Sequence, residues 1–224
     1  MPHDGVLGLS LEGLSGAPLS SFFERLMDSA SGLLPHFAIT LGATEGSIMF
    51  GGHDRTRLAA PIRWFPVSHP DMGFWQVPIL AVRIGNVTVD PCRGGCHGVI
   101  DTGSSSVGAQ ADRLGMLLPS LRSAAPAATG ACLGPELVFD LAGMSLVLTA
   151  KDYTGASCKP KIGSIHLDGP EFAGFYALGT TLLRNYYTAF DWTRARVGFA
   201  PIKASASQGT MDQQRSDPVE KIVV

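Results

Sequence analysis

The stretch G-V-I-D-T-G-S-S-S, from Gly98 to Ser106, decides how the rest of the chain is interpreted. Its apolar beginning predicts a buried strand, and Asp101 follows where that strand leaves the core at a sharp turn. Gly103 has no Cβ, so the backbone can fold tightly under Asp101 and direct N–H groups at its oxygens. The hydroxyl groups able to donate to the acid or to brace the loop belong to Thr102, Ser104 and Ser105. The stretch predicts one acid held still and partly ionised.

Taken alone, the D-T-G triplet is a weak signal. By chance it arises in about 5% of chains of this length, and turns that contain Asp and Gly are common between strands. Its interpretation therefore depends on the other segments of the chain.

The composition favours a β-rich protein. Of the 224 residues only 16% are charged, whereas 27 are Gly and 15 are Pro, which suits many short strands joined by turns. This length suits one large domain or two small ones. The formal net charge is −2 and we find no cluster of Lys and Arg, so the sequence predicts no nucleic-acid surface.

The chain carries no obvious membrane or export signal. No apolar run approaches the roughly 18 residues of a membrane span, since the apolar stretch 77–89 is broken at Arg83. The first residues, M-P-H-D-G, lack a basic and apolar leader, so no signal peptide is visible.

The cysteines point to an oxidising compartment. Cys92 and Cys96 form a close pair, Cys132 and Cys158 a wide one, and the even number and spacing favour two disulfides. Because no signal peptide is visible, either the inference of an oxidising compartment is wrong, or the natural precursor starts upstream of Met1. A zinc site at Cys92, Cys96 and His97 is the alternative, but the close pair lies in a Gly-Gly turn and a second disulfide explains the other cysteines better. We expect no metal and no cofactor.

Short elements with turn signals between them predict a β-sandwich or barrel. Ser21 followed by Glu24 has the spacing of a capping box and predicts a short helix, and a second short helix is expected at 110–118. The expected strands are 37–41, 47–50, 62–67, 75–79, 84–89, 98–100, 137–141, 144–149, 162–167, 175–178, 186–190 and 197–200. Beyond Lys203 the sequence is polar and aperiodic, which predicts a disordered tail.

One modification motif is present. Asn86-Val87-Thr88 is an N-glycosylation sequon, which matters only if the chain is secreted. Such triplets are common, so the motif makes Asn86 a glycosylation candidate.

Several segments, taken in order, resemble one family. They are F-W-Q at 74–76, C-R-G-G-C-H-G-V-I-D-T-G-S-S at 92–105, A-L-G at 177–179 and N-Y-Y-T-A-F-D-W-T-R-A-R-V-G-F-A-P at 185–201. The chain resembles the pepsin and cathepsin D group of aspartic proteases, which implies a mainly β fold, the second lobe of a pepsin-like acid protease barrel with a remnant of the first. The resemblance divides the chain into a first-lobe remnant and inter-lobe segment at 1–45, a catalytic lobe at 46–203 and the tail at 204–224.

The resemblance also implies roles for individual residues. Asp101 is the catalytic acid of the second lobe, and A-L-G at 177–179 passes beneath its loop. Thr180 stands where such chains often have an acid, so a structural hydrogen bond is expected to be missing. The residues implied to support the acid loop are Thr102, Gly103, Ser104 and Ser105. The implied disulfides are Cys92–Cys96 and Cys132–Cys158. Phe74 and Val99 are candidates to line side-chain pockets, with core or cross-strand packing as the alternative.

The chain departs from the family pattern in one respect. The family uses two D-T-G or D-S-G loops, one in each lobe, and this chain has one. The segment D-G-V-L-G-L at 4–9 resembles the strand beneath the first lobe's acid loop, so that loop and the flap over the substrate are expected upstream of Met1. Aspartic proteases need two carboxylates, one as the base on a water and one as the acid toward the peptide carbonyl.

The function expected is therefore that of an aspartic endopeptidase, present as a C-terminal part that is inactive without its missing N-terminal lobe. Its substrate is a polypeptide in the cleft between the lobes, and its compartment is secreted or endosomal and lysosomal. Two alternatives stay open. One is a non-catalytic binding lobe, or pseudo-protease. The other is a homodimer that brings two Asp101 loops together.

Overall fold

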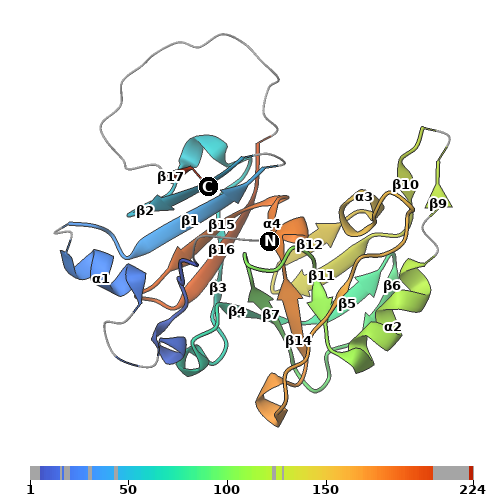
Figure 1. Ribbon diagram of the computed structural model, residues 1–224, viewed down its shortest axis with the longest axis horizontal. Helices are drawn as coiled ribbons and strands as arrows, with labels where there is room; N and C mark the ends of the chain where they lie inside the picture. The colour runs from blue at the N-terminus through green and yellow to red at the C-terminus, as the bar shows by residue number, and fades with distance from the viewer. Residues whose placement is uncertain are drawn as a thin grey trace, which may run out of the picture.

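The structure is a computed structural model that describes residues 6–15, 17, 21–29, 32–42, 45–122, 125–127, 129–203 and 222–223. Figure 1 shows a mainly β arrangement, with the largest sheet on one side of the molecule and the smaller sheets on the other. Within the described part of the chain, no helix is long and apolar enough to cross a membrane.

The largest sheet has six strands in the order β17-β2-β1-β15-β16-β3, all antiparallel. The strands are β1 (His36–Leu41), β2 (Gly46–Phe50), β3 (Arg63–Pro66), β15 (Tyr186–Asp191), β16 (Arg196–Pro201) and β17 (Ile222–Val223). The expected division at residue 45 falls between β1 and β2, which pair with each other. The division into domains stays a prediction.

Helix α1 (Phe22–Ser29) packs on this sheet (Figure 1). The expected capping box is present: the Glu24 amide donates to Ser21 Oγ at 3.2 Å, and the Ser21 amide donates to Glu24 Oε2 at 3.4 Å. Phe23 is fully buried, with its ring centroid 5.0 Å from that of Phe37. This aromatic contact fixes the helix on the sheet.

A five-stranded sheet, in the order β13-β8-β14-β7-β4, holds the D-T-G stretch. Its strands are β4 (Gln76–Ile79), β7 (Cys96–Ile100), β8 (Gly108–Ala109), β13 (Gly163–Ser164) and β14 (Phe175–Leu178). Strand β14 runs parallel to β7 and antiparallel to β8. The strand expected at 162–167 is shorter in the structure: only Gly163 and Ser164 pair with β8, and they form β13.

A four-stranded sheet, in the order β12-β11-β5-β6, completes the lobe. Its strands are β5 (Ala81–Ile84), β6 (Val87–Asp90), β11 (Leu137–Leu141) and β12 (Met144–Leu148). The single strand expected at 84–89 is wrong: Gly85, with φ of 56°, turns the chain there. Strand β5 precedes that turn, and β6 follows it and pairs back antiparallel.

The remaining elements are short. They are β9 (Ala125–Pro126), β10 (Cys132–Leu133), α2 (Ala111–Leu121), α3 (Ala150–Tyr153), α4 (Thr180–Leu183) and the 3₁₀ turns Glu12–Leu14, Arg55–Arg57, Pro70–Met72 and Pro170–Phe172. The expected helix at 110–118 extends to Leu121 in the structure. Both implied disulfides are present, Cys92–Cys96 and Cys132–Cys158. The expected disordered tail, 204–224, lies outside the described residues except for β17.

Candidate active site

Asp101 follows the last residue of β7, which lies between β14 and the edge strand β4 of the five-stranded sheet. The amide of Ile100 donates to the Trp75 carbonyl at 2.8 Å, and the amide of Asp101 donates to the Leu178 carbonyl at 3.2 Å. The backbone that leads to the acid is therefore hydrogen-bonded on both sides, to the residue before β4 and to the last residue of β14.

The carboxylate of Asp101 accepts one hydrogen bond on each oxygen. The Gly103 amide donates to Oδ1 at 2.9 Å, and the Ser104 hydroxyl donates to Oδ2 at 2.6 Å. Gly103 also lets the loop approach closely, since a Cβ there would lie 3.2 Å from Oδ1. These two donors fix the orientation of the carboxylate.

The other two loop residues are placed differently. Thr102 is exposed and lies at the edge of two apolar pockets. Ser105 contributes its carbonyl oxygen, which accepts a hydrogen bond from Thr180. Among the hydrogen bonds of residues that the structure describes, those to the Asp101 carboxylate come from Gly103 and Ser104.

The loop is supported from beneath by the start of α4. The Thr180 amide donates to the Ser104 carbonyl at 2.8 Å, and the Thr180 hydroxyl donates to the Ser105 carbonyl at 3.1 Å. Gly179 lies so close that a Cβ there would be 2.2 Å from the Ser106 carbonyl oxygen. The expectation that a hydrogen bond is missing at Thr180 is wrong, because a threonine hydroxyl reaches the loop.

Asp101 opens into an apolar pocket of about 280 Å³. Phe74 and Val99 both line it, together with apolar residues near the N-terminus such as Leu7 and Leu9. Phe74 also packs edge-on against the buried Phe175, with ring centroids 6.1 Å apart. It therefore both lines the pocket and packs against the core, the two roles that were expected as alternatives. Among the described lining residues, Asp101 carries the only ionisable side chain.

A second pocket, of about 440 Å³, is also lined by Thr102. It shares Leu7, Leu9 and Ile39 with the first, and its polar lining includes Glu45 and Arg184. Leu7 is 50% exposed, so part of this apolar surface faces solvent. Thr102 of the acid loop therefore lines two open, mainly apolar pockets.

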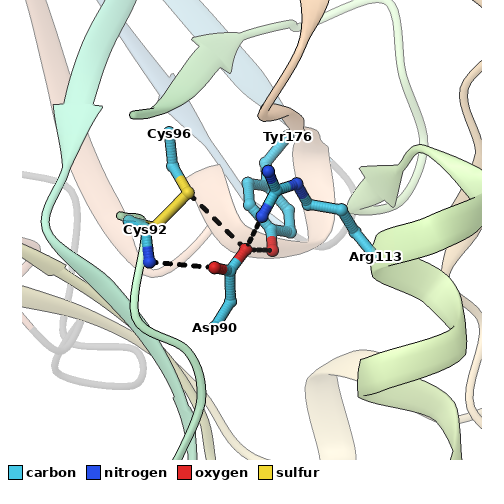
Figure 2. The surroundings of a disulfide bond; sticks show 5 residues. All are labelled: Asp90, Cys92, Cys96, Arg113 and Tyr176. Carbon is cyan, nitrogen blue, oxygen red and sulfur yellow. Dashed lines mark hydrogen bonds and ion pairs between the residues drawn. A yellow bond between two sulfur atoms is a disulfide. The ribbon is translucent and has the colours of Figure 1, made fainter. Parts of the chain in front are cut away.

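The sequence reasoning missed a charged cluster at the other end of β7. Asp90, Arg113 and Tyr176 meet beside the Cys92–Cys96 disulfide, as Figure 2 shows. Ligand atoms of Asp90, Cys92 and Cys96 lie within 4.8 Å of one another. Both sulfurs are joined in the disulfide, so they are not free thiolates for zinc. No sequence motif indicates this cluster.

The glycosylation candidate belongs to the four-stranded sheet, whereas the acid loop follows β7 of the five-stranded sheet. Asn86 is exposed in the turn between β5 and β6, and Thr88 of the same sequon is exposed on β6. The motif is thus on the surface, where an oligosaccharide has room.

Comparisons with known proteins fit this geometry. The sequence model of eukaryotic aspartyl proteases matches residues 1–202. Gastricsin from Mus musculus is 30% identical over 220 residues, covering 88% of this chain and 54% of gastricsin. Cathepsin E-A from Xenopus laevis is 30% identical over 217 residues (89% and 53%), and pepsin A from Sus scrofa is 28% identical over 222 (90% and 54%). The chain spans about half the length of the curated relatives it matches.

Proposed function

Because this chain belongs to the eukaryotic aspartyl protease family, we propose that it supplies one of the two catalytic aspartates of an aspartic endopeptidase. The observation that carries the proposal is the Asp101 carboxylate, held by a donor on each oxygen and opening into an apolar pocket. Its mainly β sheets suit a lobe of a pepsin-like protease.

The proposed chemistry needs a second carboxylate. One acid acts as the base that activates water, while the other, protonated, donates toward the peptide carbonyl, and the closeness of the two like charges keeps one of them protonated. A single acid cannot fill both roles. We propose that the second carboxylate comes from an N-terminal lobe that docks over the larger apolar pocket beside Thr102.

The loop donors have a defined task in this mechanism. Each carboxylate oxygen has two lone pairs, and Gly103 and Ser104 each occupy one. The remaining lone pairs are free to accept a hydrogen bond from the attacking water. Fixing the carboxylate in advance removes the cost of orienting it during the reaction.

The proposed substrate is a polypeptide that lies across Asp101. Phe74 and Val99 are proposed to contact substrate side chains, since both line the same pocket as the acid. Two disulfides support an oxidising compartment, secreted or endosomal and lysosomal. No cofactor enters this proposal.

A second candidate function is a binding lobe that does not cleave its peptide. It is favoured by one observation: among the described residues that line the pocket, Asp101 carries the only carboxylate. In this case the acid loop stabilises the lobe and the pocket holds a peptide without turnover.

Peptidase activity tests the proposal. The chain is assayed on an unfolded protein at roughly pH 3 to 6, alone over a concentration series and fused to the N-terminal half of Mus musculus gastricsin. We expect activity in the fusion that Asp101→Asn abolishes. Asp112→Asn, at an exposed carboxylate on α2, is the matched control and keeps the activity.

The other outcomes separate the alternatives. Activity of the chain alone that rises with the square of its concentration supports the homodimer. If both the chain alone and the fusion bind peptide without cleaving it, the result supports the binding lobe. A fusion whose activity survives Asp101→Asn contradicts the role of this acid.

A further inference from the structure

A buried carboxylate joins three elements of the lobe. Asp90, the last residue of β6, is 4% exposed. Its Oδ1 accepts a hydrogen bond from the Cys92 amide at 2.9 Å, and its Oδ2 accepts one from the Tyr176 hydroxyl at 2.7 Å. The Arg113 guanidinium contacts the same Oδ2. Figure 2 shows the turn before β7, strand β14 and helix α2 meeting at this one side chain.

These elements carry the acid loop. In the parallel pair of β7 and β14, Tyr176 lies opposite Gly98 and Leu178 lies opposite Ile100. The two strands are in close contact, since a Cβ at Gly98 would lie 2.7 Å from Leu178 Cδ1. The Leu178 carbonyl in turn accepts the Asp101 amide hydrogen bond. These contacts form a continuous connection from Tyr176 along β14 to the backbone of Asp101.

The turn itself is fixed twice. The disulfide joins Cys92 to Cys96, the first residue of β7, and Cys96 Sγ lies 3.5 Å from Asp90 Oδ2. The disulfide fixes the two ends of the turn to each other, while Asp90 fixes the turn to β14 and α2. Only the second link reaches the strand beneath the acid loop.

General stabilisation is a weak explanation of this cluster. A buried ion pair loses hydration, and an apolar replacement is often equally stable. Here Arg113 Nε is also buried without a hydrogen-bond partner among the described residues, so part of that loss is not compensated. A set of directed bonds to one carboxylate does, however, select a single arrangement of the elements it joins.

We propose that Asp90 is a positioning residue for Asp101, and that it acts through Tyr176 and β14 to hold the acid loop in register. This positioning matters for function only if Asp101 has its proposed catalytic role, so in that respect the inference rests on the proposed function. The geometric effect itself is measurable in the absence of proteolysis.

The cluster keeps its charge in acid. Burial alone would raise the pKa of Asp90, but hydrogen bonds from Tyr176, Cys92 and Arg113 outweigh it, and the pKa is lowered from its ordinary value. The titratable groups that face Asp90 are Arg113 and Tyr176, since both nearby cysteines are disulfide-bonded. The positioning contacts thus persist at a pH where exposed carboxylates begin to lose their charge.

The test is amide hydrogen exchange, read residue by residue by NMR on the full chain. Tyr176→Phe removes one hydroxyl bond to Asp90 and leaves the ring. We expect the amides of Asp101 and Gly103 to exchange about tenfold faster, the size of effect that losing a hydrogen bond to a charged group produces. The Gly103 amide proton shifts upfield as its bond to the carboxylate weakens. Amides of β11 and β12 keep their rates.

Two further variants make the result specific. Ser145→Ala is the matched control, because it also removes a hydroxyl bond to a carboxylate, that of Asp140 at 2.6 Å, but in the four-stranded sheet. It is expected to leave the Asp101 loop unchanged. Arg113→Lys keeps the cation beside Asp90 and is expected to retain most of the loop's protection.

The proposal is overturned by either of two results. One is a Tyr176→Phe chain whose loop amides and Gly103 proton match those of the unsubstituted chain. The other is acceleration by one common factor in the loop and in β11 and β12, which would mean loss of stability throughout the lobe. Neither result depends on whether Asp101 takes part in catalysis.

Discussion

The Thr180 hydroxyl donates a hydrogen bond to the carbonyl of Ser105 at 3.1 Å, which joins α4 to the acid loop by a side chain as well as by the backbone. The Thr180 amide makes the second link, to Ser104. Because α4 starts directly after β14, the strand beneath the loop and the loop itself are closed into one unit. Substitutions at this junction are therefore expected to report on the site.

Gly179→Ala is expected to be strongly destabilising. Its Cβ would lie 2.2 Å from the Ser106 carbonyl oxygen and 2.6 Å from that of Ser104, and both are backbone atoms. The loop has to move to admit the methyl group, at a cost of about 1–3 kcal/mol in the free energy of unfolding. Urea denaturation followed by circular dichroism measures this change.

Gly115→Ala is the matched control for that substitution. Gly115 lies in α2, and a Cβ there meets nothing within 4 Å. Since alanine is the better helix former, the free energy of unfolding should rise by about 1 kcal/mol. Equal effects of the two substitutions would contradict the close contact at Gly179.

The two disulfides are expected to contribute unequally. Cys132 and Cys158 are 26 residues apart in sequence, and Cys92 and Cys96 are 4 apart. Because the longer loop restricts the unfolded chain more, replacing its cysteines with alanine should cost about 3.5 kcal/mol, against about 2 kcal/mol for the short loop. Denaturation of each double-alanine variant measures both values, and a larger loss from the short loop would contradict loop entropy as the cause.

The local elements of the fold are predictable from the sequence. The capping box at Ser21 and Glu24 predicts α1, which is confirmed. The strands predicted at 137–141 and 144–149 are also confirmed, and they pair with each other as β11 and β12. The strand predicted at 84–89 is wrong because Gly85 and Asn86 form a two-residue turn between β5 and β6. The Gly-Asn pair is a hairpin signal, and the prediction of one continuous strand overlooked it.

Contacts between distant segments are not predictable in this way. The D-T-G stretch indicates the loop around Asp101, and Gly103 and Ser104 are found as its donors. Nothing in the sequence pairs Asp90 with Tyr176, which is 86 residues away. Each of those residues is ordinary in its own segment, and only the parallel pairing of β7 with β14 brings them together.

Asn86 is expected to carry an oligosaccharide when the chain passes through a eukaryotic secretory pathway. The residue is exposed in a two-strand turn, and its sequon is intact. Intact mass measured before and after treatment with a peptide N-glycosidase tests this, and Asn86→Gln removes the glycan without changing the fold. A secreted chain whose mass is that of the bare polypeptide would contradict the prediction.

His36 of β1 and His53 in the segment after β2 form a close pair. His53 Nε2 lies 3.2 Å from His36 Nδ1. Burial lowers the pKa of His53 below its ordinary value of 6.5, and the neighbouring His36, Arg55 and Arg196 lower it further against the opposing effect of Asp191. The folded chain therefore binds this proton less readily than the unfolded chain does.

It follows that His53 lowers stability as pH falls from about 6.5 toward its folded pKa, and that its effect is constant below that value. His53→Gln should flatten the free energy of unfolding in this range of pH, as measured by urea denaturation at several pH values. His166→Gln, at an exposed histidine in the loop after β13, is the control and should keep the slope of the unsubstituted chain. An unchanged slope in His53→Gln would mean that the proton uptake on unfolding comes from other groups.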